Sequence, residues 1–168
     1  MDANMTVFQP ILILAAFLCS LVAGFLFAFA AVVMPGIRRL DDGAFIRAFQ
    51  VIDGVIQNNQ PLFLIVWVGS MPVLLAAAVV GAWALNGADR VLMLVAAAVY
   101  FLCVHLPTVA INIPLNNALQ KLDSGAMNEP ERTRARDNFE ARWNRWNALR
   151  TGCASITSFA LMLLLLRL

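Results

Sequence analysis

The sequence is short of charged residues. Only 13% of its 168 residues are Asp, Glu, Lys or Arg, whereas 61% are hydrophobic. Soluble domains have roughly 25% charged residues, and one this apolar would expose large apolar patches to water. The formal net charge of +2 is too small to indicate a nucleic-acid partner. The composition therefore predicts a protein whose partner is membrane lipid.

The usual signatures of metals, cofactors and catalytic motifs are also missing. The three cysteines, Cys19, Cys103 and Cys153, lie far apart in apolar stretches, which excludes a CxxC redox pair and a cysteine zinc site. The single histidine, His105, excludes bis-His haem ligation but leaves a His/Met pair open. The sequence has no GxGxxG, P-loop or Glu-x-x-His pattern. We therefore expect neither a metal nor a cofactor.

What the sequence does have is four long apolar runs. They extend from Ile11 to Met34, from Pro61 to Leu85, from Val91 to about Leu115 and from Thr151 to Leu166. A spanning helix needs about 20 apolar residues because the hydrocarbon core is about 30 Å thick. The fourth run has 16 residues, so it also needs Trp146 to Arg150 in the interface. We expect one all-α domain over residues 1–168, an integral membrane four-helix antiparallel bundle.

The first run could be mistaken for a cleaved signal peptide, because Ala28-Phe29-Ala30 resembles a cleavage site. However, the residues before the run include Asp2 and no basic residue, and the run itself is too long. These features favour a retained helix.

The connections between the runs differ in length and charge. Asn86 to Arg90 is short, whereas Pro35 to Gln60 and Asn116 to Arg150 are long and lie on one side of a four-span protein. The long connections contain ten basic residues, and the opposite side contains only Arg90 and Arg167. Loops rich in Lys and Arg stay in the cytoplasm. We therefore expect a multi-pass protein of the cell membrane with cytoplasmic long loops and both termini outside.

Both long connections are expected to be partly helical. Phe45, Phe49, Ile52 and Ile56 recur at spacings of four, three and four residues, which is a helical stripe. The segment from Glu129 to Arg150 begins with Pro130 in its first turn and is expected to continue unbroken into the fourth span. Helices 2 and 4 should therefore extend into the cytoplasm.

Polar residues gather near the cytoplasmic end of the spans. Four of them, in the third run and directly after it, share one face at 3.6 residues per turn: His105, Thr108, Asn112 and Asn116. Pro107 and Pro114 remove backbone donors there, and loosened backbone at membrane depth is tolerated where it lines a cavity. At a similar depth are Asn59 and the helical face of Trp143, Asn147 and Arg150. This cluster either cross-links the helices or forms a binding site.

Each member of the cluster has a structural interpretation besides a functional one. His105 could be a hydrogen-bonded core residue, although ionisable residues in membranes are often functional. Arg150 could be an interface anchor, and Trp143 an aromatic-belt residue. Asn112 and Asn116 could simply bridge helices.

Two segments resemble a known family. Asn112-Ile113-Pro114-Leu115-Asn116-Asn117 resembles the Asn-Val-Pro-Leu-Asn-Asn stretch of the anthrone-oxygenase-like family, with Ile113 as a conservative departure. The stretch from Trp143 to Arg150 resembles that family's Trp-x-x-Trp-Asn-x-x-Arg motif. The resemblance implies a small four-helix membrane protein. Some fungal members are credited with oxidising anthrones to anthraquinones with molecular oxygen and no known cofactor, and most members have no known function. The matching residues here are Asn112, Asn116, Trp143, Asn147 and Arg150.

Two functions follow from these observations. The first is an oxygenase-like membrane enzyme that binds or oxidises an apolar phenolic or polycyclic aromatic molecule. His105 would act as its base, Arg150 would stabilise the oxyanion, and the substrate would contact Asn59, Asn112, Asn116, Trp143 and Asn147. The second is a non-catalytic accessory or lipid-binding protein in which the polar cluster only fixes helix register. A cavity that reaches His105 and Arg150 would favour the first. The sequence leaves the oligomeric state open.

Overall fold

A computed structural model describes residues 3–168 of the chain, and every regular element in this range is helical. Four stretches are long and apolar enough to cross a membrane: Met5–Ile37, Pro61–Ala84, Gly87–Gln120 and Glu129–Leu166. The expected all-α fold with four membrane spans is therefore confirmed.

Several of these spans are composed of more than one element. The first contains α1 (Ala3–Ala28), a π-helical segment η1 (Phe29–Val33) and α2 (Met34–Ile37). The second is α4 (Pro61–Ala84). The third contains α5 (Gly87–Val99), the π-helical segments η2 (Tyr100–His105) and η3 (Thr108–Asn112), and α6 (Ile113–Gln120). The fourth is α7 (Glu129–Leu166), and α3 (Asp42–Gln57) lies between the first two spans.

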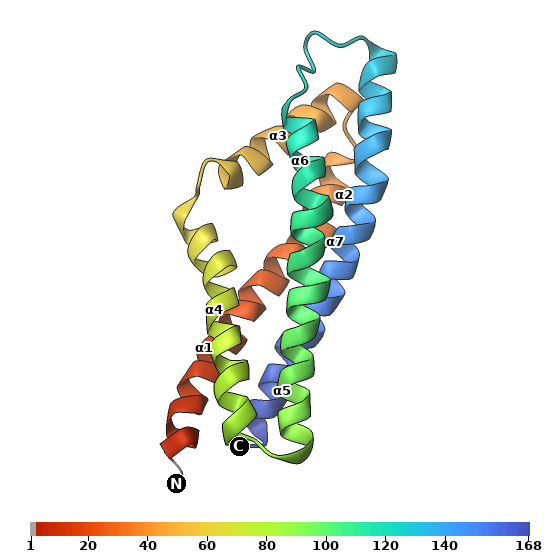
Figure 1. The fold of residues 1–168 in the computed structure, drawn as a ribbon. Helices are drawn as coiled ribbons and strands as arrows, with labels where there is room; N and C mark the ends of the chain where they lie inside the picture. The colour runs from red at the N-terminus through yellow and green to blue at the C-terminus, as the bar shows by residue number, and fades with distance from the viewer. Residues whose placement is uncertain (1–2) are drawn as a thin grey trace.

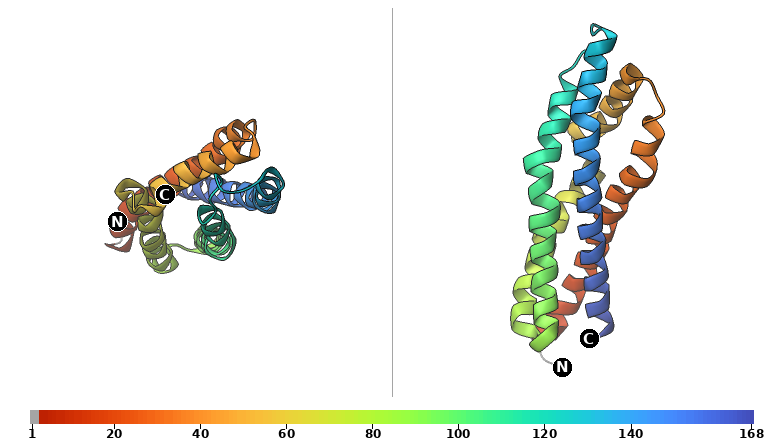
Figure 2. Two further views of the ribbon diagram at one scale, coloured as in Figure 1. Left: turned by 90° about the horizontal axis from the view of Figure 1, so that it is seen from above. Right: turned by 90° about the vertical axis from the view of Figure 1, so that its right-hand side faces the viewer.

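The spans form an antiparallel bundle (Figure 1). Both termini lie at one end, and both long connections lie at the other, as Figure 2 also shows. The most extensive helix contacts are those of α1 with α7 and with α4, and α5 packs against α7. The short connection is tighter than expected, because α4 ends at Ala84 and α5 begins at Gly87. Gly87 has a φ of 52°, a left-handed conformation that glycine adopts readily.

The outer surface of the bundle is apolar. Large side chains face outward along all four spans, among them Phe27, Trp83, Leu102 and Phe159. A contiguous exposed surface of this kind is unfavourable in water and suits lipid. The end of the bundle that holds the termini has an apolar core, which includes Phe8, Leu12, Leu74, Met93 and Leu161.

The helix before the second span is a separate element and does not continue α4. Asn59, in the linking turn, has a φ of 59°, and Gln60 has a ψ of 115°, which is not helical, before Pro61 starts α4. A proline disfavours the helical conformation at the residue before it, so Pro61 explains the break at Gln60. The helical stripe itself is confirmed: Phe45 and Phe49 of α3 are buried in a second core with Phe139 and Trp143 of α7.

The fourth helix is continuous, as expected. It has 38 residues, so at 1.5 Å per residue it is about 57 Å long, well beyond the thickness of the hydrocarbon core. Its start is fixed by a capping box: the Glu131 amide donates to the Asn128 side chain, and the Asn128 amide donates to the Glu131 carboxylate. The helix therefore carries side chains from the loop end into the apolar core.

A proline follows each π-helical segment by two positions. Pro35 follows η1, Pro107 follows η2, and Pro114 follows η3. Proline has no N–H to donate, so the helix before it loses a backbone hydrogen bond and widens locally. Two of these segments supply cavity-lining residues, as described next.

Candidate functional site

The predicted polar cluster surrounds one cavity of about 300 Å³. It lies between the two apolar cores, at the loop end of the bundle, where α3 lies against α6 and α7. Its lining includes five side chains from the two sequence motifs: Asn112, Asn116, Trp143, Asn147 and Arg150. The whole lining comes from five parts of the chain: the first span, α3, α4, the third span and α7.

Arg150 is the only arginine that lines this cavity, and it is 4% exposed. Its Nη1 donates to Thr108 Oγ1 at 2.9 Å, and its Nη2 donates to Asn147 Oδ1 at 3.0 Å. Asn147 Nδ2 in turn donates to the Leu26 carbonyl at 3.2 Å, and Thr108 donates to the Val104 carbonyl at 2.6 Å. This chain of hydrogen bonds joins α1, α7 and the third span, so the guanidinium is held at a fixed orientation.

A second network contains a carboxylate that the sequence interpretation left out of the site. Asp53 of α3 is 2% exposed and lines the cavity. It accepts hydrogen bonds from Asn116 at 2.7 Å, Gln57 at 2.6 Å and Gln120 at 3.0 Å. Asn116 also accepts from Trp143 Nε1 at 2.8 Å. The polar face of the α3 stripe was the available signal for Asp53, but only the packing of α3 shows that this face turns toward the cavity.

Two residues expected in the site do not line the cavity. The ring of His105 is buried against Tyr100 and Trp67, at centroid distances of 4.8 Å and 5.6 Å. Trp67 lines the cavity and His105 does not, so the cavity reaches Arg150 but stops short of the histidine. Asn59 is exposed in the turn between α3 and α4.

Aromatic rings form much of the remaining wall. Phe63 and Trp67 are stacked at 5.4 Å, Phe25 contacts both, and Phe49 meets Trp143 edge to face at 5.5 Å. The guanidinium of Arg150 is 5.9 Å from the Trp143 ring, within the range of a cation–π contact. A flat ring would find both edges and faces of aromatic side chains here.

The polar atoms of the cavity are almost all paired, with two exceptions. Among the described residues, Arg150 Nε and Asn112 Oδ1 are buried and have no hydrogen-bond partner. Leaving a buried donor or acceptor unpaired costs about 1–3 kcal/mol. Both residues line the cavity, and neither of these two atoms is paired within the described part of the chain. The described part of the chain contains no group of three His, Cys, Asp or Glu side chains that could hold a metal ion.

The sequence profile of the anthrone oxygenase family matches residues 63–161, more than half of the chain. The chain belongs to the anthrone oxygenase family. Neither a curated protein nor a solved structure matches it.

The anthrone oxygenase match covers only part of the cavity. Residues Asn112, Asn116, Trp143, Asn147 and Arg150 lie within it, on the third and fourth spans. Asp53 and the first span lie before it. The family membership shows a membrane oxygenase-like protein, and the five residues of the two sequence motifs line its cavity.

Proposed function

We propose that the cavity binds a flat, apolar phenolic or polycyclic aromatic molecule of the anthrone class and that the protein catalyses its oxidation by molecular oxygen. The observation that carries this proposal is an aromatic-walled cavity lined by a buried arginine whose Nε has no partner among the described residues. Its volume of about 300 Å³ lies at the lower end of ligand pockets, which favours a compact ligand.

The proposed reaction needs an acid–base step and charge stabilisation. When the methylene carbon of an anthrone loses a proton, negative charge spreads onto the carbonyl oxygen on the opposite side of the central ring. Oxygen then adds to this carbon: one oxygen atom becomes the new carbonyl oxygen, and the other leaves as water with the two methylene hydrogens. The Nε–H of Arg150 is suited to the anionic oxygen, because a fixed cationic donor in a site sheltered from water stabilises developing charge strongly.

Two groups are candidates for the base. His105 was expected from the sequence, and its Nε2 has no partner among the described residues. However, Trp67 lines the cavity and His105 does not, whereas the Asp53 carboxylate lines it directly. We propose Asp53 as the base that contacts the substrate and His105 as a residue that positions Trp67. Asn112, Asn147 and Asn116 would orient the ligand, with Trp143 against its ring.

The proposed substrate would reach the cavity from lipid. A second hollow of about 600 Å³ lies on the outer surface among α1, α3 and α4 and shares lining residues with the cavity. The shared residues are Phe25, Phe29, Ile56, Phe63 and Trp67. Its remaining lining is almost entirely aliphatic, so it suits a molecule dissolved in the bilayer.

We further propose that this end of the bundle faces the cytoplasm. The ten basic residues of the long connections lie at the same end as the cavity, which supports cytoplasmic loops and outward termini in the cell membrane.

The test uses the full chain in lipid nanodiscs with anthrone and oxygen, and follows anthraquinone by absorbance and oxygen by electrode. Arg150→Lys keeps the charge but loses the planar fork, so turnover should fall by about 10²–10³, as for a lost oxyanion donor. Arg145→Lys is the matched control, because Arg145 is exposed on the same helix, and its turnover should be unchanged. Rates no higher than in empty nanodiscs would refute the proposal.

The non-catalytic interpretation also has an observation in its favour. Apart from Asn112 Oδ1, the side-chain amides around the cavity find partners within the protein, as helix cross-links would. Under this interpretation anthrone should neither quench the fluorescence of Trp67 and Trp143 nor raise the melting temperature. Saturable quenching that Arg150→Lys weakens would exclude it.

A further inference from the structure

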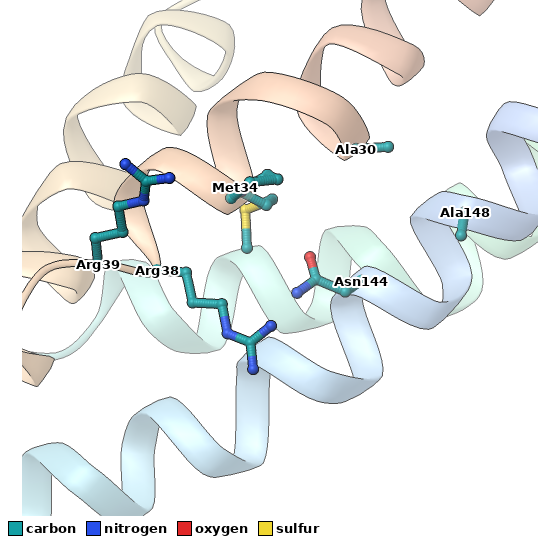
Figure 3. Close-up of a pocket in the computed structure, with 7 residues that line it drawn as sticks. Ala30, Met34, Arg38, Arg39, Asn144 and Ala148 are labelled. Atoms are coloured by element: carbon teal, nitrogen blue, oxygen red, sulfur yellow. The ribbon is translucent and has the colours of Figure 1, made fainter.

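A further hollow, lined by other residues of the first span, has a different chemistry from the cavity. It measures about 610 Å³ and lies between the end of the first span and α7. Its floor is made by small or flexible apolar residues, Ala30, Met34 and Ala148. Its rim carries Arg38, Arg39 and Asn144 (Figure 3). None of these residues lines the aromatic cavity.

The polar and apolar parts of this hollow are ordered along the bundle. Ala30 lies eight residues before Arg38, which corresponds to about 12 Å along a helix. Arg38 and Arg39 directly follow Ile37, where the first span ends. The apolar floor therefore lies within the span and the cationic rim at its boundary, as in the boundary between acyl chains and headgroups.

The arginines of the rim are available to a ligand. The Arg38 side chain is 76% exposed, and its one ion pair, to Glu140, is long at 3.7 Å. That glutamate is already held by Arg136 at 2.7 Å. Arg39 forms no ion pair within the described residues. Figure 3 shows Arg38 reaching toward α7, where Asn144 lies, whereas the side chain of Arg39 points away from Arg38.

We propose that this hollow binds one anionic phospholipid, with its phosphate at Arg38 and Asn144, the positive charge of Arg39 at the same boundary, and its first acyl methylenes against Ala30, Met34 and Ala148. Guanidinium groups and an amide are the donors that recognise phosphate oxygens, and basic pockets between spanning helices are suited to anionic headgroups. A soluble anion would not need the apolar floor. The site is independent of the proposed oxidation.

The experiment measures lipid retention by native mass spectrometry after exchange into equal amounts of phosphatidylglycerol and phosphatidylcholine. The wild-type chain should retain one phosphatidylglycerol with about a tenfold preference, because both lipids carry the phosphate but only phosphatidylcholine adds an ammonium group that the two arginines repel. The double variant Arg38→Gln/Arg39→Gln should lose that preference. The control, Arg142→Gln/Arg145→Gln, removes two exposed charges of α7 outside the hollow and should retain it.

A third variant tests the apolar floor without changing charge. Ala148→Phe fills the hollow from an exposed position, so the fold should tolerate it and lipid retention should fall at least tenfold. Equal losses in the site and control double variants would mean general attraction to a basic surface and would overturn the proposal. It would also be overturned if inorganic phosphate in detergent raised the melting temperature as much as phosphatidylglycerol, because that would show a simple anion site.

Discussion

Asp53 is the residue at which catalysis and structural support can be separated. Asp53→Asn removes the carboxylate, so anthrone turnover should fall by about 10²–10⁴, the usual contribution of a general base. His105→Phe keeps a ring against Trp67 and should change turnover by only a few fold. Anthraquinone formation per folded molecule in nanodiscs measures both effects.

The control for Asp53 is Gln120→Ala. It removes one of the three donors to the carboxylate but leaves the carboxylate in place. If Asp53 is the base, Gln120→Ala should lower the melting temperature but leave turnover almost unchanged. A large loss of turnover in His105→Phe, with Asp53→Asn still active, would reverse the assignment of the base.

The sequence predicted most of the residues of this site but not all of their positions. Asn112, Asn116, Asn147 and Arg150 were expected together and line one cavity, because helical periodicity on two helices determined their faces. The same periodicity placed His105 on that face, but η3 lies between it and Asn112. A π-helical turn holds more residues than an α-helical turn, so a face calculated at 3.6 residues per turn is rotated.

Asn59 and Asp53 show a second limit of sequence interpretation. Both belong to the α3 region. The sequence placed Asn59 at the depth of the polar cluster, but it did not show how α3 packs. The left-handed turn at Asn59 exposes its side chain, whereas the packing of α3 against α6 and α7 buries Asp53. Such placements depend on contacts between residues more than 60 positions apart, such as Asp53 and Asn116, and local sequence patterns carry no information about them.

Among the elements, the third span offers a test of the proline-linked widening. Pro114→Ala supplies an N–H that can donate to the carbonyl of Ala110, which should convert η3 toward regular α-helix. Stability should be unchanged or higher, whereas anthrone binding should weaken by about tenfold because Asn112 and Thr108 rotate relative to Arg150. Fluorescence titration and thermal unfolding measure the two effects.

Pro72→Ala is the matched control for that substitution. Pro72 also lies inside a spanning helix, α4, but α4 contains no π-helical segment and Pro72 does not line the cavity. It should leave anthrone affinity unchanged. Equal effects of the two proline substitutions would argue against a specific role of η3.

The attachment of α3 to α7 predicts a dependence on pH. Asp42 of α3 accepts a hydrogen bond from Thr133 at 2.7 Å and pairs with Arg136 at 3.0 Å. The Thr133 hydrogen bond, with the positive charge of Arg136, lowers the pKa of Asp42 below its ordinary value. A carboxylate of this kind contributes stability above about pH 4, and the contribution is lost as pH falls through the pKa of the folded state.

Asp42→Asn therefore should lower the melting temperature at pH 7 and have little effect at pH 3. Asp137→Asn, at an exposed aspartate of α7, should have little effect at either pH. Thermal unfolding in nanodiscs over this range measures the difference between wild type and variant. A difference that grows as the pH falls would contradict the proposed ion pair.

At the scale of the whole molecule, the remaining prediction is its orientation in the membrane. The two ends of the bundle are chemically unequal, since ten basic residues lie at the loop end and two at the other. Ala126 and Ala88 are exposed in the long α6–α7 connection and at the start of α5, so they are a matched pair for labelling. In intact cells a membrane-impermeant maleimide should label Ala88→Cys and should label Ala126→Cys only after the membrane is opened. The wild-type chain is the control for Cys19, Cys103 and Cys153, which lie in the spans. Labelling of Ala126→Cys from outside would place the cavity and the phospholipid hollow in the outer leaflet, and the cytoplasmic orientation would be wrong.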